Sequence, residues 1–347
     1  MPSSTVIRGG GFRPAAYGAM LLGTAFVFII SVCLGSVSVP LRDVFASVAA
    51  ALSGEKQLLT GHSDIILSVR IPRVLCVALT GASLSLCGAA MQGILRNPLA
   101  DGSTLGVSGG ASLGAVLAIS FGSRLPFFGG GGVVVTAIVF AFMSLAVILG
   151  LSHKLDRSLS TNTIILTGIV YSMFVSSIIS LVIAFAGDKV KTITFWTMGS
   201  LANTDYLNVL TILTALLLCA SLILMRSREL NAFALGEDNA RSVGVNVKRV
   251  KLELLIAVSI LIGVCVSIGG TIGFVGLVSP HMTRMLTGPN HKRLLSASMF
   301  FGACFLMLAD LLSRTIVRPM ELPVGVVTSF IGAVAFVFIF KKSGRVG

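Results

Sequence analysis

The chain has 347 residues, of which 55% are hydrophobic and only 11% are charged, and its mean hydropathy is +0.98. Roughly a quarter of the residues in a soluble globular chain are charged, so this composition excludes that class and predicts a membrane protein. The net charge of +13 comes from lysines and arginines spread over many short connectors, which argues against a basic stripe that binds nucleic acid.

Apolar runs recur along the whole chain. The first follows Arg8 and Arg13 as in a signal sequence, but it is long and lacks a convincing small-residue cleavage site, so we expect a retained helix. A spanning helix needs about 20 apolar residues, which predicts an all-α polytopic protein with about ten transmembrane helices in a single domain, residues 1–347. The runs are Ala15–Leu34, Val74–Leu95, Leu105–Phe121, Val133–Leu151, Ile164–Ala186, Leu207–Met225, Leu252–Ile268, Leu277–Leu286, Leu294–Leu312 and Pro323–Phe340.

Two of these runs, around Gly106 and Val278, are short. A straight helix of that length does not cross about 30 Å of hydrocarbon, so we expect half-helices or kinked helices packed inside the protein. Small residues also recur at four-residue spacing, which places each set on one helix face and predicts close helix packing. These sets are Gly106, Gly110 and Gly114, and Gly81, Ser85 and Ala89.

The distribution of basic residues predicts the orientation in the membrane. With the N-terminus in the cytoplasm, most of the 26 lysines and arginines fall on inside connectors and termini, as the positive-inside rule requires. Both termini are then expected in the cytoplasm. Arg70, Arg73 and Arg314 fall instead at outer helix mouths, where this rule does not place them.

The longest inside interruption covers about residues 226–251. Gly236 and Gly244 suit the sharp turns between short helices, so one interpretation is a helix–turn–helix at the membrane surface. The alternative interpretation is an ordinary solvated loop.

The residue pattern argues against enzyme chemistry. No lysine directly follows a glycine, so the chain has no Walker A phosphate loop and we expect no ATP hydrolysis by the chain itself. The four histidines share no metal-ligand spacing, and the six cysteines lie inside apolar runs without C-x-x-C spacing, so neither a metal site nor a disulfide framework is expected. We expect a transport subunit with no cofactor of its own.

Carriers driven by an ion gradient usually need an ionisable residue inside an apolar run. Asp310 is the clearest candidate for such a residue in this chain. Arg314 follows it by one helical turn, so the plain interpretation is an i,i+4 ion pair. The alternative is a proton relay, which would make the chain a secondary transporter driven by an ion gradient.

Two blocks of specific motifs cover nearly the whole chain. The first block is Arg70-Ile-Pro-Arg-Val-Leu, then Gly88-Ala-Ala-Met-Gln-Gly-Ile-Leu-Arg-Asn-Pro-Leu-Ala and Leu105-Gly-Val-Ser-Gly-Gly-Ala. The second is Phe195-Trp-Thr-Met-Gly-Ser-Leu, Ala234-Leu-Gly, Gly273-Phe-Val-Gly-Leu-Val-Ser-Pro-His, Leu308-Ala-Asp and Glu321-Leu-Pro-Val-Gly-Val-Val-Thr. Both blocks closely resemble the FecCD family of permeases, and the motifs occur in the order expected for that family.

The resemblance implies a type II ATP-binding-cassette importer in the cytoplasmic membrane. The family's subunits have ten transmembrane helices, and two of them, identical or homologous, surround a central path. Two cytoplasmic ATPase subunits hold the ATP and Mg, and a soluble or lipid-anchored binding protein delivers the cargo. That cargo is a metal chelate, with a ferric siderophore expected first and haem or cobalamin as the other candidates. An exporter of the same architecture is a further alternative.

The resemblance also implies roles for individual residues. Coupling helices that contact the ATPase are expected in the 226–251 segment. A gate is expected in two cytoplasmic connectors, and the binding protein is expected to dock at the outer mouth. Snorkelling to lipid headgroups is the alternative for the docking arginines, and a turn that ends a helix is the alternative for Asn97-Pro98. The coupling residues are Ala234, Leu235, Gly236, Glu237, Arg241 and Gly244; the gate residues are Asn97, Leu99, Thr161 and Asn162; the docking residues are Arg70, Arg73 and Arg314.

Overall fold

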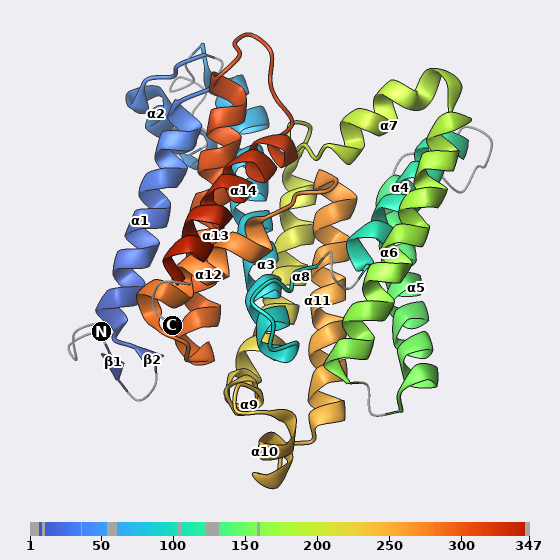
Figure 1. The fold of residues 1–347 in the computed structure, drawn as a ribbon. Helices are drawn as coiled ribbons and strands as arrows, with labels where there is room; N and C mark the ends of the chain where they lie inside the picture. Colours follow the sequence, from blue (N-terminus) through green and yellow to red (C-terminus); the bar gives the residue numbers. More distant parts are fainter. Residues whose placement is uncertain are drawn as a thin grey trace.

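The computed structural model describes residues 7–8, 11–35, 37–53, 61–102, 106–122, 132–157 and 160–343. Within these ranges the chain is a bundle of helices (Figure 1). The exception is a hairpin of two very short antiparallel strands, β1 (Ile7–Arg8) and β2 (Gly11–Phe12). The all-α prediction is therefore confirmed apart from this hairpin.

In the part of the chain that the structure describes, seven helices are long and apolar enough to cross a membrane. One of the seven spans is continuous from a π-helical turn, η3 (Ile65–Arg70), into α3. Each residue advances about 1.5 Å, so even 20 residues cover about 30 Å. The seven are α1 (Pro14–Cys33), α3 (Ile71–Ile94), α5 (Gly132–Leu155), α6 (Thr161–Ala184), α8 (Tyr206–Met225), α11 (Val247–Gly269) and α13 (His291–Thr315).

Three further helices coincide with the remaining apolar runs: α4 (Val107–Phe121), α12 (Val275–Thr287) and α14 (Val324–Ser343). α4 and α12 correspond to the two runs expected to be short, and at about 1.5 Å per residue they are about 22 and 20 Å long. Both are shorter than the hydrocarbon core of a bilayer, and α12 also contains Pro280. Each apolar run of the sequence therefore lies on a helix.

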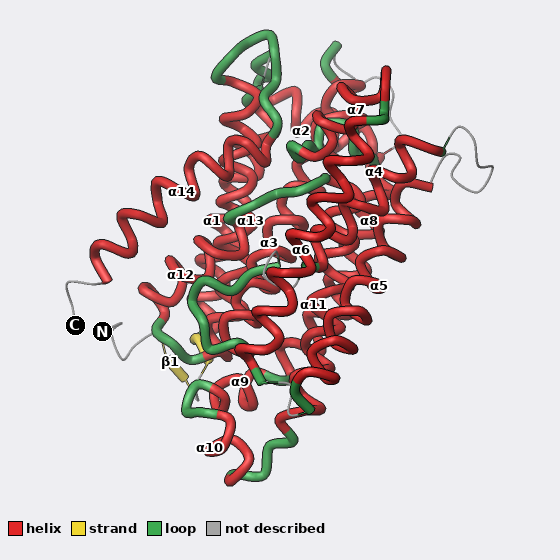
Figure 2. Tube along the Cα trace, turned by 45° about the vertical axis from the view of Figure 1, so that its right-hand side comes forward, coloured by secondary structure: helices red, strands yellow, loops and turns green. Residues whose placement is uncertain are grey.

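The shorter polar helices lie at the two ends of the bundle. α2 (Leu41–Ser53) and α7 (Val190–Thr197), the latter preceded by the 3₁₀ turn η5 (Gly187–Lys189), are at the upper end in Figure 1. α9 (Ser227–Phe233) and α10 (Glu237–Ser242) are at the lower end (Figures 1 and 2). α1 starts near this end, and α14 runs toward it. The 226–251 segment is thus a helical pair and not an irregular loop.

Small residues bring the helices close together, as the four-residue spacing predicts. A methyl group on Gly81 of α3 would lie 2.3 Å from the carbonyl oxygen of Gly302 on α13. A methyl group on Gly114 of α4 would lie 2.5 Å from the carbonyl oxygen of Thr136 on α5. Real Cβ atoms do not approach this closely, so the two helix pairs pack backbone against backbone. α3, buried along most of its length, lies at the centre of this arrangement.

Side-chain caps fix where three of the helices begin. Asp205 accepts a hydrogen bond from the backbone N–H of Asn208 at the start of α8. Asn246 accepts one from the N–H of Arg249 at the start of α11, and Asn290 accepts one from the N–H of Lys292 at the start of α13. Such caps satisfy amide groups that a helix leaves free in its first turn. The polar connectors thus set the register at which the apolar segments enter the bundle.

Candidate functional site

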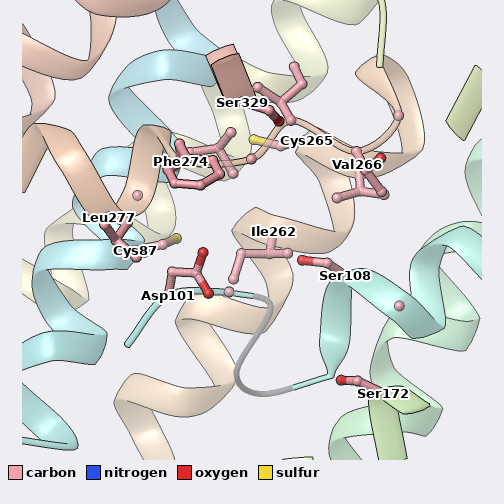
Figure 3. Close-up of a pocket in the computed structure, with 18 of the residues that line it drawn as sticks. Cys87, Asp101, Ser108, Ser172, Ile262, Cys265, Val266, Phe274, Leu277 and Ser329 are labelled. Atoms are coloured by element: carbon pink, nitrogen blue, oxygen red, sulfur yellow. The ribbon is translucent and has the colours of Figure 1, made fainter. Parts of the chain in front are cut away.

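A cavity of about 860 Å³ opens between α3, α4, α6, α11, α12 and α14. Its wall combines apolar side chains with small hydroxyl groups, including Ser108, Ser172 and Ser329 (Figure 3). Among the residues that line it, Asp101 alone carries a charge. Two connectors complete the wall: the segment that holds Leu99 and Asp101, and the glycine-containing segment between α11 and α12.

Two serine hydroxyls of the cavity wall on α6 are already bonded to their own helix. The Ser172 hydroxyl donates to the carbonyl of Gly168 at 2.8 Å, and the Ser177 hydroxyl donates to that of Met173 at 3.0 Å. Hydroxyls that bond their own helix can still accept a hydrogen bond from a guest. No group of three or more His, Cys, Asp or Glu side chains in the described part of the chain is placed to hold a metal ion. The described wall of the cavity thus offers apolar groups, hydroxyls and the carboxylate of Asp101.

The four expected gate residues lie in two segments. Asn97 closes a turn after α3, because its side-chain oxygen accepts a hydrogen bond from the N–H of Leu99 at 2.9 Å. Leu99 is 44% exposed and lines the cavity. Thr161 and Asn162 begin α6, and no hydrogen bond among the described residues joins them to Asn97 or Leu99. The turn expected at Asn97-Pro98 is present, and the gate role stays a prediction.

The α9–α10 pair is anchored on one side and exposed on the other. Leu230 and Phe233 of α9 are fully buried, whereas Leu235 and Val243 at the two turns are each 73% exposed. Gly236, with φ +114° and ψ 152°, has a backbone conformation that is essentially reserved for glycine. Gly244 is also left-handed, with φ +88°. The two glycines therefore make the turns predicted for them, and the apolar side chains beside them project outward.

The other residues expected to couple to an ATPase are also on this pair. Ala234 and Arg241 are exposed, and Arg241 pairs with Asp238 at 3.1 Å within the same short helix. At the other end of the pair, Arg226 bridges Glu229 at 2.9 Å and Glu253 of α11 at 2.7 Å. The hydrogen bond to Glu229, supported by the one to Glu253, raises the pKa of Arg226, which therefore stays charged. The segment is thus a structured unit held by its own ion pairs.

Glu237, the first residue of α10, joins this unit to the bundle. Its Oε1 atom lies 2.6 Å from the Lys251 ammonium of α11 and accepts a hydrogen bond from the Thr161 hydroxyl of α6 at 3.1 Å. Lys251 is only 2% exposed. Asn231 of α9 makes a second junction, since its Oδ1 accepts hydrogen bonds from the backbone N–H and ring Nδ1 of His291 at the start of α13. Both helices of the pair are therefore connected to the membrane helices.

The opposite end of the bundle holds a buried cluster of charges. Arg73 donates to Asp310 Oδ1 from Nη2 at 2.9 Å and from Nε at 3.1 Å, and to Glu321 Oε2 from Nη1 at 2.7 Å. Arg314 Nε lies 2.9 Å from Asp310 Oδ2. The predicted i,i+4 pair of Asp310 and Arg314 is confirmed. Asp310 is 1% exposed and is balanced by two guanidinium groups.

The expected docking arginines are buried in this chain: Arg70 is 5% exposed, Arg73 is 7% and Arg314 is 3%. Arg70 donates hydrogen bonds to the carbonyls of Val32, Cys33 and Val37, and Arg314 donates to those of Ser31 and Leu34. These two cations therefore satisfy free carbonyl groups at the C-terminal end of α1, where the helix dipole favours positive charge. This capping role explains why arginines lie at the helix mouths, and docking stays a prediction.

Three participants in these sites were not assigned a role from the sequence. Lys251 and Val243 lie in the 226–251 segment, and Glu321 opens one of the family-like motifs. Lys251 and Glu321 find their partners through the tertiary fold, which residue spacing does not reveal. Val243 had a usable signal, because it directly precedes Gly244 just as Leu235 precedes Gly236.

Comparison with known proteins identifies the family. The profile of the FecCD transport family matches residues 23–342. An uncharacterized ABC transporter permease protein, YvrB of Bacillus subtilis, is 42% identical over 96% of each chain. The molybdate import system permease protein MolB of Haemophilus influenzae is 34% identical over 96% of this chain and 99% of its own. The hemin transport system permease protein HmuU of Yersinia pestis is 34% identical over 93% of this chain and 96% of its own.

A solved structure has the same fold along the whole chain. It is described as an inward-facing conformation of an ABC transporter assigned provisionally to the metal-chelate type. The TM-score is 0.82 at 31% sequence identity, and the match covers 95% of this chain and 100% of the other. The fold described above thus has a counterpart among solved ABC transporters. The chain is a multi-pass membrane protein and belongs to the FecCD transport family of ABC transporter permeases.

Proposed function

We propose that this chain is the membrane-spanning subunit of an ATP-binding-cassette importer that carries a metal chelate across the cytoplasmic membrane. A ferric siderophore is the first candidate, and haem and cobalamin belong to the same class. Support comes from the FecCD match, from the relative named for hemin transport and from the metal-chelate description of the solved structure. The relative named for molybdate import makes an oxyanion the cargo to test against this class.

The observation that carries this proposal is the exposed apolar end of the α9–α10 pair. Leu235 and Val243 are each 73% exposed at two glycine turns, on a unit whose other face is buried in the bundle. Exposed apolar groups on a rigid projection are typical of a surface that a partner covers. A separate cytoplasmic ATPase subunit docks there and moves this unit as a rigid body, and in the assembled transporter two such subunits bind the ATP and Mg.

The cavity supplies the passage. It is bounded by helices of one copy, so a second permease subunit, identical or homologous, closes the path around a two-fold axis. Asn97, Leu99, Thr161 and Asn162 form the cytoplasmic gate of this path. A wall of hydroxyl and apolar groups suits a cargo that must leave again, since strong binding in the passage would slow release.

A binding protein outside the cell membrane delivers the cargo to the opposite end. Arg70, Arg73 and Arg314 act there by holding the outer ends of α1, α3 and α13 in the shape on which that protein docks. Both termini face the cytoplasm, because the start of α1 and the C-terminal part of α14 lie toward the end that holds α9 and α10 (Figures 1 and 2). The positive-inside rule supports the same orientation.

An ion-gradient-driven carrier gains no support from these sites. Its coupling acid, Asp310, is held between the guanidinium groups of Arg73 and Arg314, at 2.9 Å from each, which is the geometry of a structural ion-pair cluster.

The proposal is tested by co-expressing the chain with candidate ATPase subunits and measuring ATP hydrolysis in lipid. We expect the wild-type chain to co-purify with an ATPase, and Gly236→Val and Glu237→Lys to weaken association or to uncouple hydrolysis from uptake. The proposal fails if no ATPase associates while uptake driven by an ion gradient persists.

A further inference from the structure

The Glu237 junction connects the proposed coupling unit to two walls of the cavity. α6, which begins at Thr161, contributes Ser172 to the cavity, and α11, which contains Lys251, contributes Ile262. Glu237 Oε1 lies within hydrogen-bond distance of both Thr161 and Lys251. We propose that Lys251 is a positioning residue that keeps Glu237 bound to Thr161, so that α10 and the cytoplasmic ends of α6 and α11 move together.

Burial makes this junction difficult to open. The Lys251 side chain is 2% exposed and that of Glu237 is 21% exposed, so separation would leave an ammonium group without its carboxylate in a place that water barely reaches. Removing one partner of a buried ion pair is costly because the other charge stays behind uncompensated. A rigid movement of α10 therefore carries Lys251 and Thr161 with it, where a solvated loop would absorb the movement.

The other ion pairs of this segment do not form such a connection. Arg241 pairs with Asp238 inside α10, at a guanidinium that is 51% exposed and a carboxylate that is 95% exposed. The Arg226–Glu253 pair joins the end of α8 to α11 and does not involve α10. Among the described ion pairs, only Lys251–Glu237 links α10 to a membrane helix and is also almost fully buried on one side. A displacement of α10 is therefore transmitted through this pair to the gate segment at Thr161.

The inference rests on the proposed function, and its test separates the two. Spin labels are placed on exposed positions of the two bodies, Asp238→Cys on α10 and Leu166→Cys on α6, in a chain whose native cysteines are replaced. The distance between the labels is measured in the permease–ATPase complex in lipid, without nucleotide and with ATP, Mg and vanadate. With native Lys251, we expect one narrow distance distribution that is the same in both states.

The variant Lys251→Met removes the charge at similar side-chain length, and we expect it to broaden the distribution or to shift it between the two states while ATP hydrolysis continues. Lys251→Arg restores the narrow distribution, as does the exchange of charges in Lys251→Glu with Glu237→Lys. The matched control is Lys189→Met, which removes a lysine that donates to the carbonyls of Ile119 and Ser120 near η5. We expect this control to leave the label distance unchanged.

Each outcome decides between the claims. A distribution in Lys251→Met that matches the native one in both states overturns the positioning role, as does a native distance that changes with nucleotide. A melting temperature that falls equally in Lys251→Met and Lys251→Arg, with both distributions broadened, would mean that Lys251 only stabilises the fold. Failure of any ATPase to bind the native chain rejects the proposed function, whereas the unliganded distributions still report whether Lys251 holds α10 to α6.

Discussion

Arg73 and Asp310 meet in the interior of the bundle although 237 positions separate them along the chain, and the guanidinium donates to Oδ1 from Nη2 at 2.9 Å and from Nε at 3.1 Å. The contact joins the start of α3 to the last turns of α13, two helices that also pack backbone against backbone at Gly81 and Gly302. The two helices are therefore held by close packing along their length and by a buried charge pair at one end.

The first prediction is that Asp310→Asn strongly destabilises the protein. The substitution keeps the side-chain size but removes the charge between Arg73 and Arg314, and breaking a buried ion pair costs about 3–5 kcal/mol. We expect a lower melting temperature in detergent. The control is Glu321→Gln, which removes the other, 34% exposed carboxylate partner of Arg73 and should cost less than about 1 kcal/mol. Equal losses from the two variants would contradict the assignment of Asp310 as the central charge.

The second prediction concerns the contact between α3 and α13. Gly81→Ala places a methyl group 2.3 Å from the carbonyl oxygen of Gly302, so the helices must separate, and overpacking of this kind costs about 1–3 kcal/mol. Gly150→Ala is the matched control, because a methyl group on Gly150 of α5 meets nothing within 4 Å. That control should be neutral or stabilising by up to about 1 kcal/mol, since alanine favours helix. Thermal unfolding of both variants in the same detergent measures the difference.

The third prediction tests the cavity as the passage. Ser172→Trp fills part of the wall on α6, so we expect cargo uptake to fall while ATP hydrolysis by the assembled transporter continues. Ser180→Trp serves as control, because Ser180 is an exposed serine two turns further along the same helix and does not line the cavity. Uptake of a radiolabelled ferric siderophore and of molybdate into vesicles is the measurement. Equal uptake by the native chain and Ser172→Trp would place the path elsewhere.

The sequence predicts the parts of this structure that local physics determines. Lipid forces every backbone polar group to be satisfied within a segment, so each apolar run becomes a helix. The pair of Asp310 and Arg314 follows from one helical turn of spacing. The positions of Gly236 and Gly244 allow the short α9–α10 pair but leave a solvated loop open, and only the family resemblance favours the helices.

Contacts between residues on different helices could not be predicted from the sequence in this way. The resemblance implies that Arg70 docks a binding protein at the outer mouth, and the structure adds that its guanidinium is bound to the carbonyls that end α1. Nothing in the order of residues indicates that α1 ends beside α3. Lys251 and Glu237 are only 14 positions apart, but they belong to different helices separated by a turn, so no helical periodicity relates them. Sequence spacing thus identifies ion pairs within one helix, whereas pairs between different helices are identified only by the tertiary structure.

The last prediction is that Leu235→Asp weakens association with the ATPase without changing the stability of the chain. Leu235 is 73% exposed and makes no large contribution to the core, so a carboxylate there stays solvated in the free chain. At an interface the same carboxylate loses its water and has no assigned partner, and anchor residues at interfaces contribute 2 kcal/mol or more, which is roughly 30-fold in affinity. Leu41→Asp on α2, a leucine that is 48% exposed at the opposite end, is the control and should leave the affinity unchanged. Titration of the purified chain in nanodiscs with the ATPase gives both dissociation constants. Equal affinities for Leu235→Asp and Leu41→Asp would show that the tip of the α9–α10 pair is not the docking surface.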